Sequence, residues 1–386
     1  MNASLLRNPK LVTAALVALG LGAALSLAQG AKTAIESSGD FQWSPSRLLA
    51  EGVNPYEYYL QHGKGGLLIL NQAPNYLHAI YVLLYPLGQM EWVSAKIAWA
   101  VINLSLSAAV LVVFIRAARL SRRAGFVVAT FFLCSFPERL VIGNGQLSLF
   151  CLFFASFLLY ETRASAVWLG LSYMKYSFAP PLAAYLLFKQ GPWRFLLSLV
   201  FATLGFVAFL LMQPTHDLIT LIAEPLRVNL VATPIGAADW MSLAQFFQRK
   251  QSGGMLWLIS VYAVPAAASL AAGYYYAHRS GDRLIVFSAL SVVSLLTFKH
   301  MFYDFVFLLP AFAACAARPD HPASRLGFAC VVYFWLFLRA LAVLPSIAVR
   351  WPLWLHGVNF VVLCLLLVAI ERLRRESERS ITASAA

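Results

Sequence analysis

Residues 92–115 read WVSAKIAWAVINLSLSAAVLVVFI, and this stretch decides the class of fold. It holds a single charged residue, Lys96, in a length slightly above the ~20 apolar residues that cross a bilayer as a helix. Comparable apolar runs recur along the 386-residue chain, which is 61% hydrophobic and only 12% charged. Soluble domains carry about twice that share of charged residues. The sequence therefore predicts a polytopic membrane protein.

The membrane-spanning elements are predicted to be helices. Strands of a membrane barrel alternate apolar and polar residues over about 10 positions, whereas these apolar runs are longer and uninterrupted. Helices and closed barrels are the two forms that satisfy every backbone polar group inside lipid. We expect an all-α fold with about 10–12 transmembrane helices, forming a single transmembrane catalytic domain over residues 1–386.

Basic residues account for the formal net charge of +13 and gather in short clusters at the ends of apolar runs. This distribution is typical of the positive-inside rule and not of a nucleic-acid-binding face, so no nucleic-acid partner is expected. If these clusters are cytoplasmic, both chain ends are cytoplasmic too. The clusters are Arg7/Lys10, 116–123, Lys189/Arg194, Arg279/Arg283, Arg318/Arg325 and 372–379.

Ten simple crossings follow from this orientation, with the first one leading outward. They are expected at approximately 10–29, 92–115, 124–137, 146–160, 193–212, 255–276, 284–298, 302–317, 325–344 and 353–370. The first run could also be a signal peptide, but no A-x-A cleavage site follows it, so an uncleaved helix is favoured. The five cysteines lie in or beside apolar runs without metal-ligand spacing, and we interpret them as packing residues.

Two segments do not fit a simple crossing. Residues 165–188 have basic residues at both ends, and we expect two short helices broken around Lys175 and Pro180-Pro181, because proline disrupts a helix interior. Residues 74–90 are rich in tyrosine and contain prolines, so we expect an interfacial helix on the outer side.

Two long loops, about 30–91 and 213–254, then lie on the outer side, and chemistry is expected there. We expect a multi-pass protein of a bacterial-type cytoplasmic membrane, with its active site on the outer, periplasmic side. No internal repeat is visible, which weighs against the commonest transporter architectures.

The first outer loop opens with GDFQW, residues 39–43. Asp40 beside Phe41 and Trp43 is a candidate general base for an acceptor hydroxyl at the water–lipid boundary; the alternative is a solvated loop aspartate. Further on, Asn54 and Tyr56 belong to a G-x-N-P-Y turn with either a substrate-binding or a purely structural role.

Four potential cations make an anionic substrate more plausible than a neutral one. Arg139 lies in ERLVIGNGQLS (138–148) with Gln146, and an ordinary loop is the alternative there. Lys175 lies deep in apolar sequence, where a lysine is costly unless it meets water, a counter-ion or an anionic ligand. Lys299 and His300 lie close to Asp304, so these residues either hold a phosphate or pair with one another.

Several catalytic signatures are missing from the chain. It has no P-loop, no G-x-G-x-x-G, no H-E-x-x-H and no G-x-S-x-G motif. The first outer loop also lacks a D-x-D pair, so neither a metal nor a cofactor is expected.

The order of several short motifs resembles the polytopic glycosyltransferases of the GT-C superfamily, specifically glycosyltransferase family 87, the polyprenol-phosphate-mannose-dependent α-mannosyltransferases. Each motif is weak, but together they cover most of the chain in the family's order. They are Asp40, Gly52–Tyr56, Pro74–Pro86, Gly143–Leu147, Lys175 with Pro180, Trp240–Leu243 and Lys299–Tyr303.

The resemblance implies a GT-C-type fold and an inverting transfer of a sugar, with mannose the first expectation, from a polyprenyl-phosphate-linked donor to a glycolipid or glycan hydroxyl. Asp40 would be the catalytic base. The implied donor-phosphate-binding residues are Lys175, His300, Lys299 and Arg139, and the implied substrate-binding residues are Gln146, Asn54, Tyr56 and Trp43. Membrane lipids are the remaining expected partners.

Two segments depart from the family pattern. The chain has Gln72-Ala73-Pro74-Asn75 where relatives often have N-P-P, and Thr297-Phe298-Lys299-His300 where they often have a run with two histidines. These changes affect the expected sugar more than the reaction type. Two other functions stay open at this point, namely a lipid or solute transporter or flippase and a non-catalytic membrane subunit.

Overall fold

The computed structural model of the chain describes residues 9–39, 41–68, 72–213, 217–232, 236–251, 255–279, 281–338 and 352–385. Every regular element in these ranges is a helix, and none of them contains a strand. The prediction of an all-α polytopic membrane protein is confirmed. One continuous cluster of buried apolar side chains extends from Ala34 to Leu373 and joins most of the helices.

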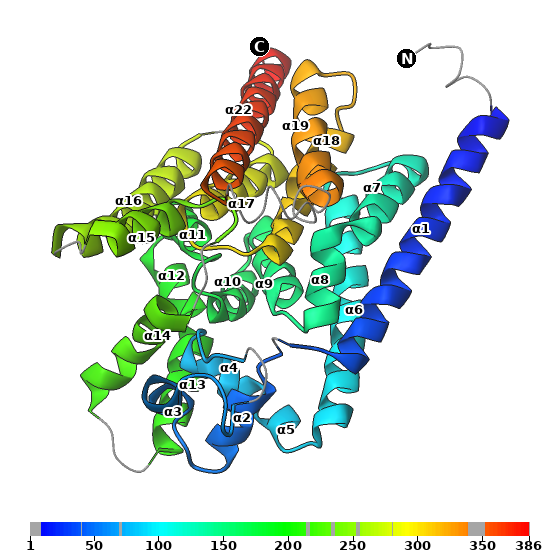
Figure 1. The fold of residues 1–386 in the computed structure, drawn as a ribbon. Helices are drawn as coiled ribbons and strands as arrows, with labels where there is room; N and C mark the ends of the chain where they lie inside the picture. Colours follow the sequence, from blue (N-terminus) through cyan, green and yellow to red (C-terminus); the bar gives the residue numbers. More distant parts are fainter. Residues whose placement is uncertain are drawn as a thin grey trace.

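The first helix, α1 (Pro9–Glu36), lies along α6 (Trp92–Ala117), α7 (Arg122–Cys134) and α8 (Phe136–Asn144) (Figure 1). It extends past residue 29, where we predicted its end, because residues 31–36 contain neither proline nor glycine. Helices α7 and α8 meet at a bend of 56°. Ser135 caps α8 there, and Pro137 occupies its first turn, where the missing N–H is tolerated.

The predicted first outer loop folds into four short helices in the lower part of Figure 1. They are α2 (Trp43–Ala50), α3 (Pro55–His62), α4 (His78–Leu83) and α5 (Tyr85–Gly88). The last two replace the one interfacial helix predicted over 74–90, and Pro86 in the first turn of α5 marks the division. Both are far too short to cross a bilayer.

The middle of the chain is a series of short helices. They are α9 (Ser148–Ala155), η2 (Ser156–Tyr160), α10 (Arg163–Leu169), η3 (Gly170–Met174), α11 (Pro180–Gln190), α12 (Pro192–Ser198) and α13 (Val200–Leu211). As predicted, residues 165–188 form two helical arms with a break between Met174 and Pro180. The break leaves Lys175 at the end of the first arm.

The C-terminal part begins with α14 (Leu218–Ala232) and α15 (Trp240–Gln251), which occupy the second outer loop. The remaining elements are α16 (Met255–Ala277), α17 (Arg283–Thr297), η4 (Phe302–Leu308), α18 (Leu309–Ala316), α19 (Pro322–Val332), the π-helical turn η5 (Tyr333–Phe337) and α22 (Pro352–Ala385). Helix α16 packs on α11, while α22 packs on α17 and α19.

Fewer helices than predicted are long enough to span a bilayer by themselves. Within the described ranges, three segments are long and apolar enough, namely Thr13–Glu36, Trp92–Ala117 and Trp354–Arg379, and two bent pairs raise the number to five. Four further apolar helices have only 10–17 residues, below the ~20 that span the hydrocarbon core. The count of 10–12 crossings therefore stays a prediction.

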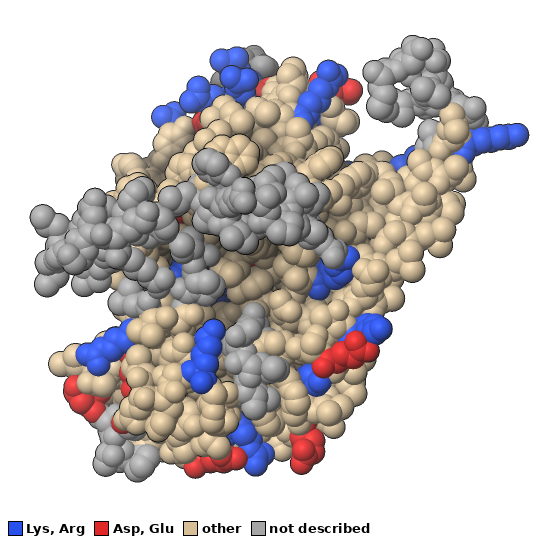
Figure 2. All heavy atoms as spheres, in the orientation of Figure 1, with Lys and Arg blue, Asp and Glu red and all other residues tan. Residues whose placement is uncertain are grey.

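Charged side chains gather towards the two ends of the molecule (Figure 2). Lysine and arginine dominate the upper end, over the ends of α1 and α22, whereas basic and acidic residues mix below. Ion pairs join residues that are far apart in the sequence at one end of the molecule. Arg283 pairs with Glu161 at 2.8 Å, and Arg318 pairs with Asp282 at 2.9 Å. This grouping agrees with the predicted clustering of basic residues. Which side of the membrane each end faces stays a prediction.

Candidate functional site

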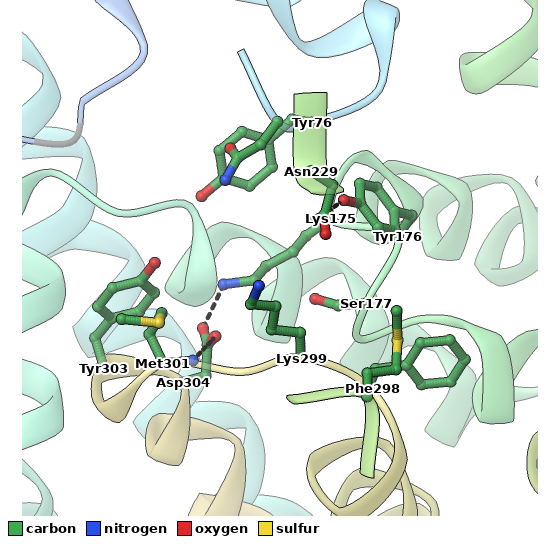
Figure 3. A pocket seen from close by; sticks show the side chains of 12 residues that line it. Tyr76, Lys175, Tyr176, Ser177, Asn229, Phe298, Lys299, Met301, Tyr303 and Asp304 are labelled. Carbon is green, nitrogen blue, oxygen red and sulfur yellow. Dashed lines mark hydrogen bonds and ion pairs between the residues drawn. The ribbon is translucent and has the colours of Figure 1, made fainter. Parts of the chain in front are cut away.

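A cavity of about 490 Å³, including space open to solvent, lies where six segments of the chain converge. Figure 3 shows its lining side chains. They come from the segment before α4 (Asn75, Tyr76), the break after η3 (Lys175, Tyr176, Ser177), α14 (Asn229), α15 (Met241), the segment after α17 (Phe298, Lys299, Met301) and η4 (Tyr303, Asp304). Both predicted outer loops therefore contribute to one cavity.

Lys175 and Asp304 form a buried ion pair in the cavity wall. The same carboxylate oxygen accepts a hydrogen bond from Ser148 Oγ at 2.5 Å, and Lys175 Nζ also donates to that hydroxyl at 3.2 Å. The break before Pro180 turns the chain so that Lys175 reaches η4. The structure thus contains the counter-ion that a lysine in apolar sequence requires.

His300 contacts Asp304 of this pair but does not line the cavity. Its Nδ1 lies 3.1 Å from Asp304 Oδ2 and its Nε2 lies 3.0 Å from Ser294 Oγ, so both ring nitrogens already have partners. Burial lowers the pKa of His300, although Asp304 opposes the shift. His300 therefore contacts the Asp304 carboxylate and Ser294, and its predicted contact with a donor phosphate stays a prediction.

Lys299 enters the cavity from the opposite wall, and its ammonium group points to the same part of the cavity as that of Lys175 (Figure 3). Lys299 Nζ donates to Gln245 Oε1 at 3.0 Å. The backbone N–H of the next residue, His300, donates to Asp239 Oδ2 at 3.4 Å. Contacts with the second outer loop therefore hold the segment that carries Lys299.

Asp239 is fully buried beside this segment and accepts from Ser242 N at 2.8 Å and Ser242 Oγ at 3.0 Å. Burial raises its pKa to about 7, and the hydrogen bonds with Ser242 and His300 counter part of that shift. About half of these carboxyls are therefore ionised at neutral pH, and the ionised form interacts electrostatically with Lys299.

The cavity lining is cationic overall. Among the described residues that line it, two lysines face a single carboxylate, so one positive charge remains. Asn75 adds a hydrogen-bonding group, because its buried side-chain oxygen has no partner in the described part of the chain. Such an oxygen accepts from hydroxyl donors. The lining is suited to a ligand that combines an anionic group with hydroxyls.

Asp40 lies outside the described residues, but its neighbours approach this site. The Phe41 ring stacks on Trp99 at 5.2 Å, and Trp99 Nε1 donates to the Gly145 carbonyl at 2.8 Å. The residue after Gly145 is Gln146, whose side-chain oxygen accepts at 3.2 Å from the hydroxyl of the cavity residue Tyr76. A chain of direct contacts therefore joins the residue after Asp40 to the cavity wall.

Gln146 and Tyr56 support the cavity without lining it, since both bond to Tyr76. Tyr56 is fully buried and donates to the Tyr76 carbonyl at 2.6 Å. Asn54 instead caps α3 through the backbone N–H of Tyr56 at 3.0 Å, and its amide donates to Glu224 of α14 at 2.9 Å. These residues contact other parts of the protein around the cavity, and their predicted contact with a ligand stays a prediction.

Arg139 and Trp43, two of the predicted site residues, contact other parts of the chain. Arg139 Nη1 donates to Gln29 of α1 at 2.9 Å, and Trp43 Nε1 donates to the Met90 carbonyl at 3.1 Å. Neither lines the cavity. The structure therefore does not bring them together with Lys175 and Lys299.

Sequence reasoning missed Tyr76, Asn75 and Asp239 as members or supports of this site. Asn75 belongs to the segment that departs from N-P-P, and Asp239 directly precedes the W-M-S-L segment. The polar residues beside these motifs were therefore the feature of the sequence that could have indicated the additional site residues. Within the described ranges, no group of three His, Cys, Asp or Glu is placed to hold a metal ion.

The fold and the cavity define a polytopic all-α membrane protein with a cationic cavity. Residues 79–303, more than half of the chain, match the family model described as glycosyltransferase family 87. The chain belongs to glycosyltransferase family 87 and is a membrane glycosyltransferase. No curated protein matches it, and no solved structure does.

Proposed function

We propose that this protein transfers a sugar from a polyprenyl-phosphate-linked donor to an acceptor hydroxyl, with inversion, at the outer face of the cytoplasmic membrane. The observation that carries the proposal is the single surplus positive charge of the cavity lining, provided by Lys175 and Lys299 against Asp304. A polyprenyl phosphosugar is a phosphodiester with one negative charge and therefore complements it.

The two lysines have a further role as the reaction proceeds. When the bond between the anomeric carbon and the phosphate oxygen breaks, the phosphate becomes a monoester with about −1.5 to −2 charge. Cations already positioned at that oxygen stabilise the developing charge. Asp304 holds Lys175 in place through their ion pair, and Ser148 bonds to both groups.

Asp40 is the proposed base. It accepts the acceptor's proton as that oxygen attacks the anomeric carbon on the face opposite the phosphate, and polyprenyl phosphate leaves. The Asn75 side-chain oxygen is positioned to accept from a sugar hydroxyl. Mannose is the proposed sugar, and a glycolipid or glycan is the proposed acceptor, both from the family resemblance.

The test uses purified protein in liposomes, polyprenyl-phosphate-[¹⁴C]mannose as donor and octyl α-mannoside as acceptor. We expect labelled disaccharide together with equimolar polyprenyl phosphate. GDP-[¹⁴C]mannose serves as the second donor, and its use in place of the lipid donor would refute the donor class. Movement of intact lipid donor between leaflets, with no sugar transfer, would identify a flippase instead.

A further inference from the structure

A second hollow, of about 1020 Å³ including space open to solvent, lies at the end of the molecule where the basic clusters meet. Three helix ends surround it: the last turn of α6, the end of η2 and the first turn of α17. Its polar lining consists of Arg116, Arg119, Tyr160, Asp282 and Arg283. None of these residues belongs to the cavity described above.

The acidic groups at this hollow already have cationic partners. Asp282 pairs with Arg318 at 2.9 Å, and the neighbouring Glu161 pairs with Arg283 at 2.8 Å. Arg116 and Arg119 are exposed, and within the described ranges neither guanidinium forms a hydrogen bond or an ion pair. Two positive charges without a counter-ion in the described protein therefore border the hollow.

The backbone at this hollow is also unusual. Within the described ranges, the non-glycine residues with positive φ are Arg119 at 50° and Glu161 at 51°, and both lie here. Arg119 directly follows Ala118, the C-cap of α6, at the position where a left-handed residue is most often glycine. A non-glycine residue in that conformation costs free energy, and such outliers cluster at ligand-binding sites. A function of the Arg119 side chain would explain why a non-glycine residue occupies this position.

Exposed aromatic residues lie near the hollow. Tyr160 is 54% exposed and Trp168 is 42% exposed, and the Phe157 ring contacts both at 6.2 and 6.1 Å. Trp193 is 78% exposed and precedes Arg194, which donates to the Glu161 carbonyl at 3.0 Å. Tryptophan and tyrosine concentrate at the membrane–water interface.

We propose that this hollow binds the phosphate-bearing headgroup of an anionic phospholipid through Arg116 and Arg119, with Tyr160 as a hydroxyl donor. The planar guanidinium group matches phosphate geometry. Basic pockets between membrane helices bind anionic headgroups in this way. The site is independent of sugar transfer and does not rest on the identity of the donor.

The experiment measures lipid retention by native mass spectrometry of the full chain in detergent, after addition of phosphatidylglycerol or phosphatidylcholine. We expect the parent to retain one phosphatidylglycerol and to lose phosphatidylcholine. The R116Q/R119Q variant removes both arginines and should bind phosphatidylglycerol about 30-fold more weakly. R122Q/R123Q is the matched control, because it removes the same charge from exposed arginines that do not line the hollow, and it should bind like the parent.

Three outcomes would overturn the proposal. Equal loss of binding in both double variants would indicate a diffuse basic surface, and equal retention of both lipids would indicate ordinary apolar contact. Displacement of phosphatidylglycerol by millimolar inorganic phosphate would identify a soluble anion as the ligand. If R116Q/R119Q fails to fold, R116Q alone is compared with R122Q by the same measurement.

Discussion

Lys175 and Asp304, which are 129 positions apart in the chain, form a buried ion pair in the wall of the candidate cavity. The pair joins the broken hairpin of α10–α11 to the start of η4. The position of the proposed phosphate ligand therefore depends on a tertiary contact. Asp304 also accepts from Ser148, His300 and the Met301 backbone, so the carboxylate is held on both oxygens.

Asp304→Asn removes the charge that compensates Lys175. Breaking one partner of a buried pair leaves an unpaired charge and costs about 3–5 kcal/mol, so we expect a lower thermal unfolding midpoint together with slower transfer. Lys175→Met combined with Asp304→Asn removes both charges and keeps an amide oxygen that can accept from these donors, so it should recover part of the stability and none of the transfer activity. An Asp304→Asn protein as stable and active as the parent would exclude a role for the pair.

Lys299→Gln removes one of the two cavity cations and leaves the ion pair intact. A charge-assisted hydrogen bond contributes about 1.5–3 kcal/mol, so kcat/KM for the lipid donor should fall about 10- to 100-fold. Lys299→Arg should retain more activity, because it keeps the positive charge. Lys32→Gln, on the exposed surface of α1, is the matched control. Equal effects of Lys299→Gln and Lys32→Gln would remove Lys299 from the donor site.

Asp40→Asn tests the proposed base. General base catalysis contributes about 10²–10⁴-fold, so kcat should fall by that factor while the donor KM stays close to that of the parent. Glu36→Gln, at the end of α1, removes a nearby exposed carboxylate and should leave kcat unchanged. Full transfer activity in a normally folded Asp40→Asn protein would assign the base to another residue.

Asp239 gives the stability a defined pH dependence. Burial raises its pKa to about 7 in the folded protein, whereas an unfolded aspartate titrates near ~3.9. The folded state therefore binds a proton that the unfolded state releases, and the unfolding free energy falls as pH rises between about 4 and 7. The slope is at most about 1.4 kcal/mol per pH unit. Asp239→Asn removes this titration, so the parent's unfolding midpoint should rise relative to the variant's on acidification from pH 8 to 5. Parallel curves would contradict the assignment.

The structural features that depend on residues close together in the chain could be predicted from the sequence. Apolar length and proline position correctly indicated an all-helical membrane protein and the break between Lys175 and Pro180, because both depend on residues adjacent in the chain. The spacing of apolar runs predicted the helical segments but not their individual lengths. Several predicted spans are short helices, whose exact length depends on tertiary packing.

The site was less accessible to sequence reasoning, because partners far apart in the chain determine it. Lys175 and Lys299 line one cavity, and the cost of a lysine in apolar sequence was the signal for Lys175. Nothing local indicated that Arg139 would turn to Gln29 of α1 or that His300 would face Ser294. Both residue types suit a phosphate, and only their neighbours in space decide which groups they contact.

Gly145→Ala tests the link between the first outer loop and the cavity. Gly145 has φ +72°, and a Cβ atom there would lie 2.7 Å from Phe41 Cβ and 2.8 Å from Ser38 Oγ. The added methyl must displace residues 38–41, which carry Asp40, so we expect about 1–3 kcal/mol of destabilisation and a fall in kcat larger than the change in donor KM. Gly20→Ala on α1, where the new atom meets only Phe126 at 3.5 Å, is the matched control and should behave like the parent. Normal kcat in Gly145→Ala would show that the position of residues 38–41 does not limit transfer, and it would separate Phe41 and its neighbours from the reaction.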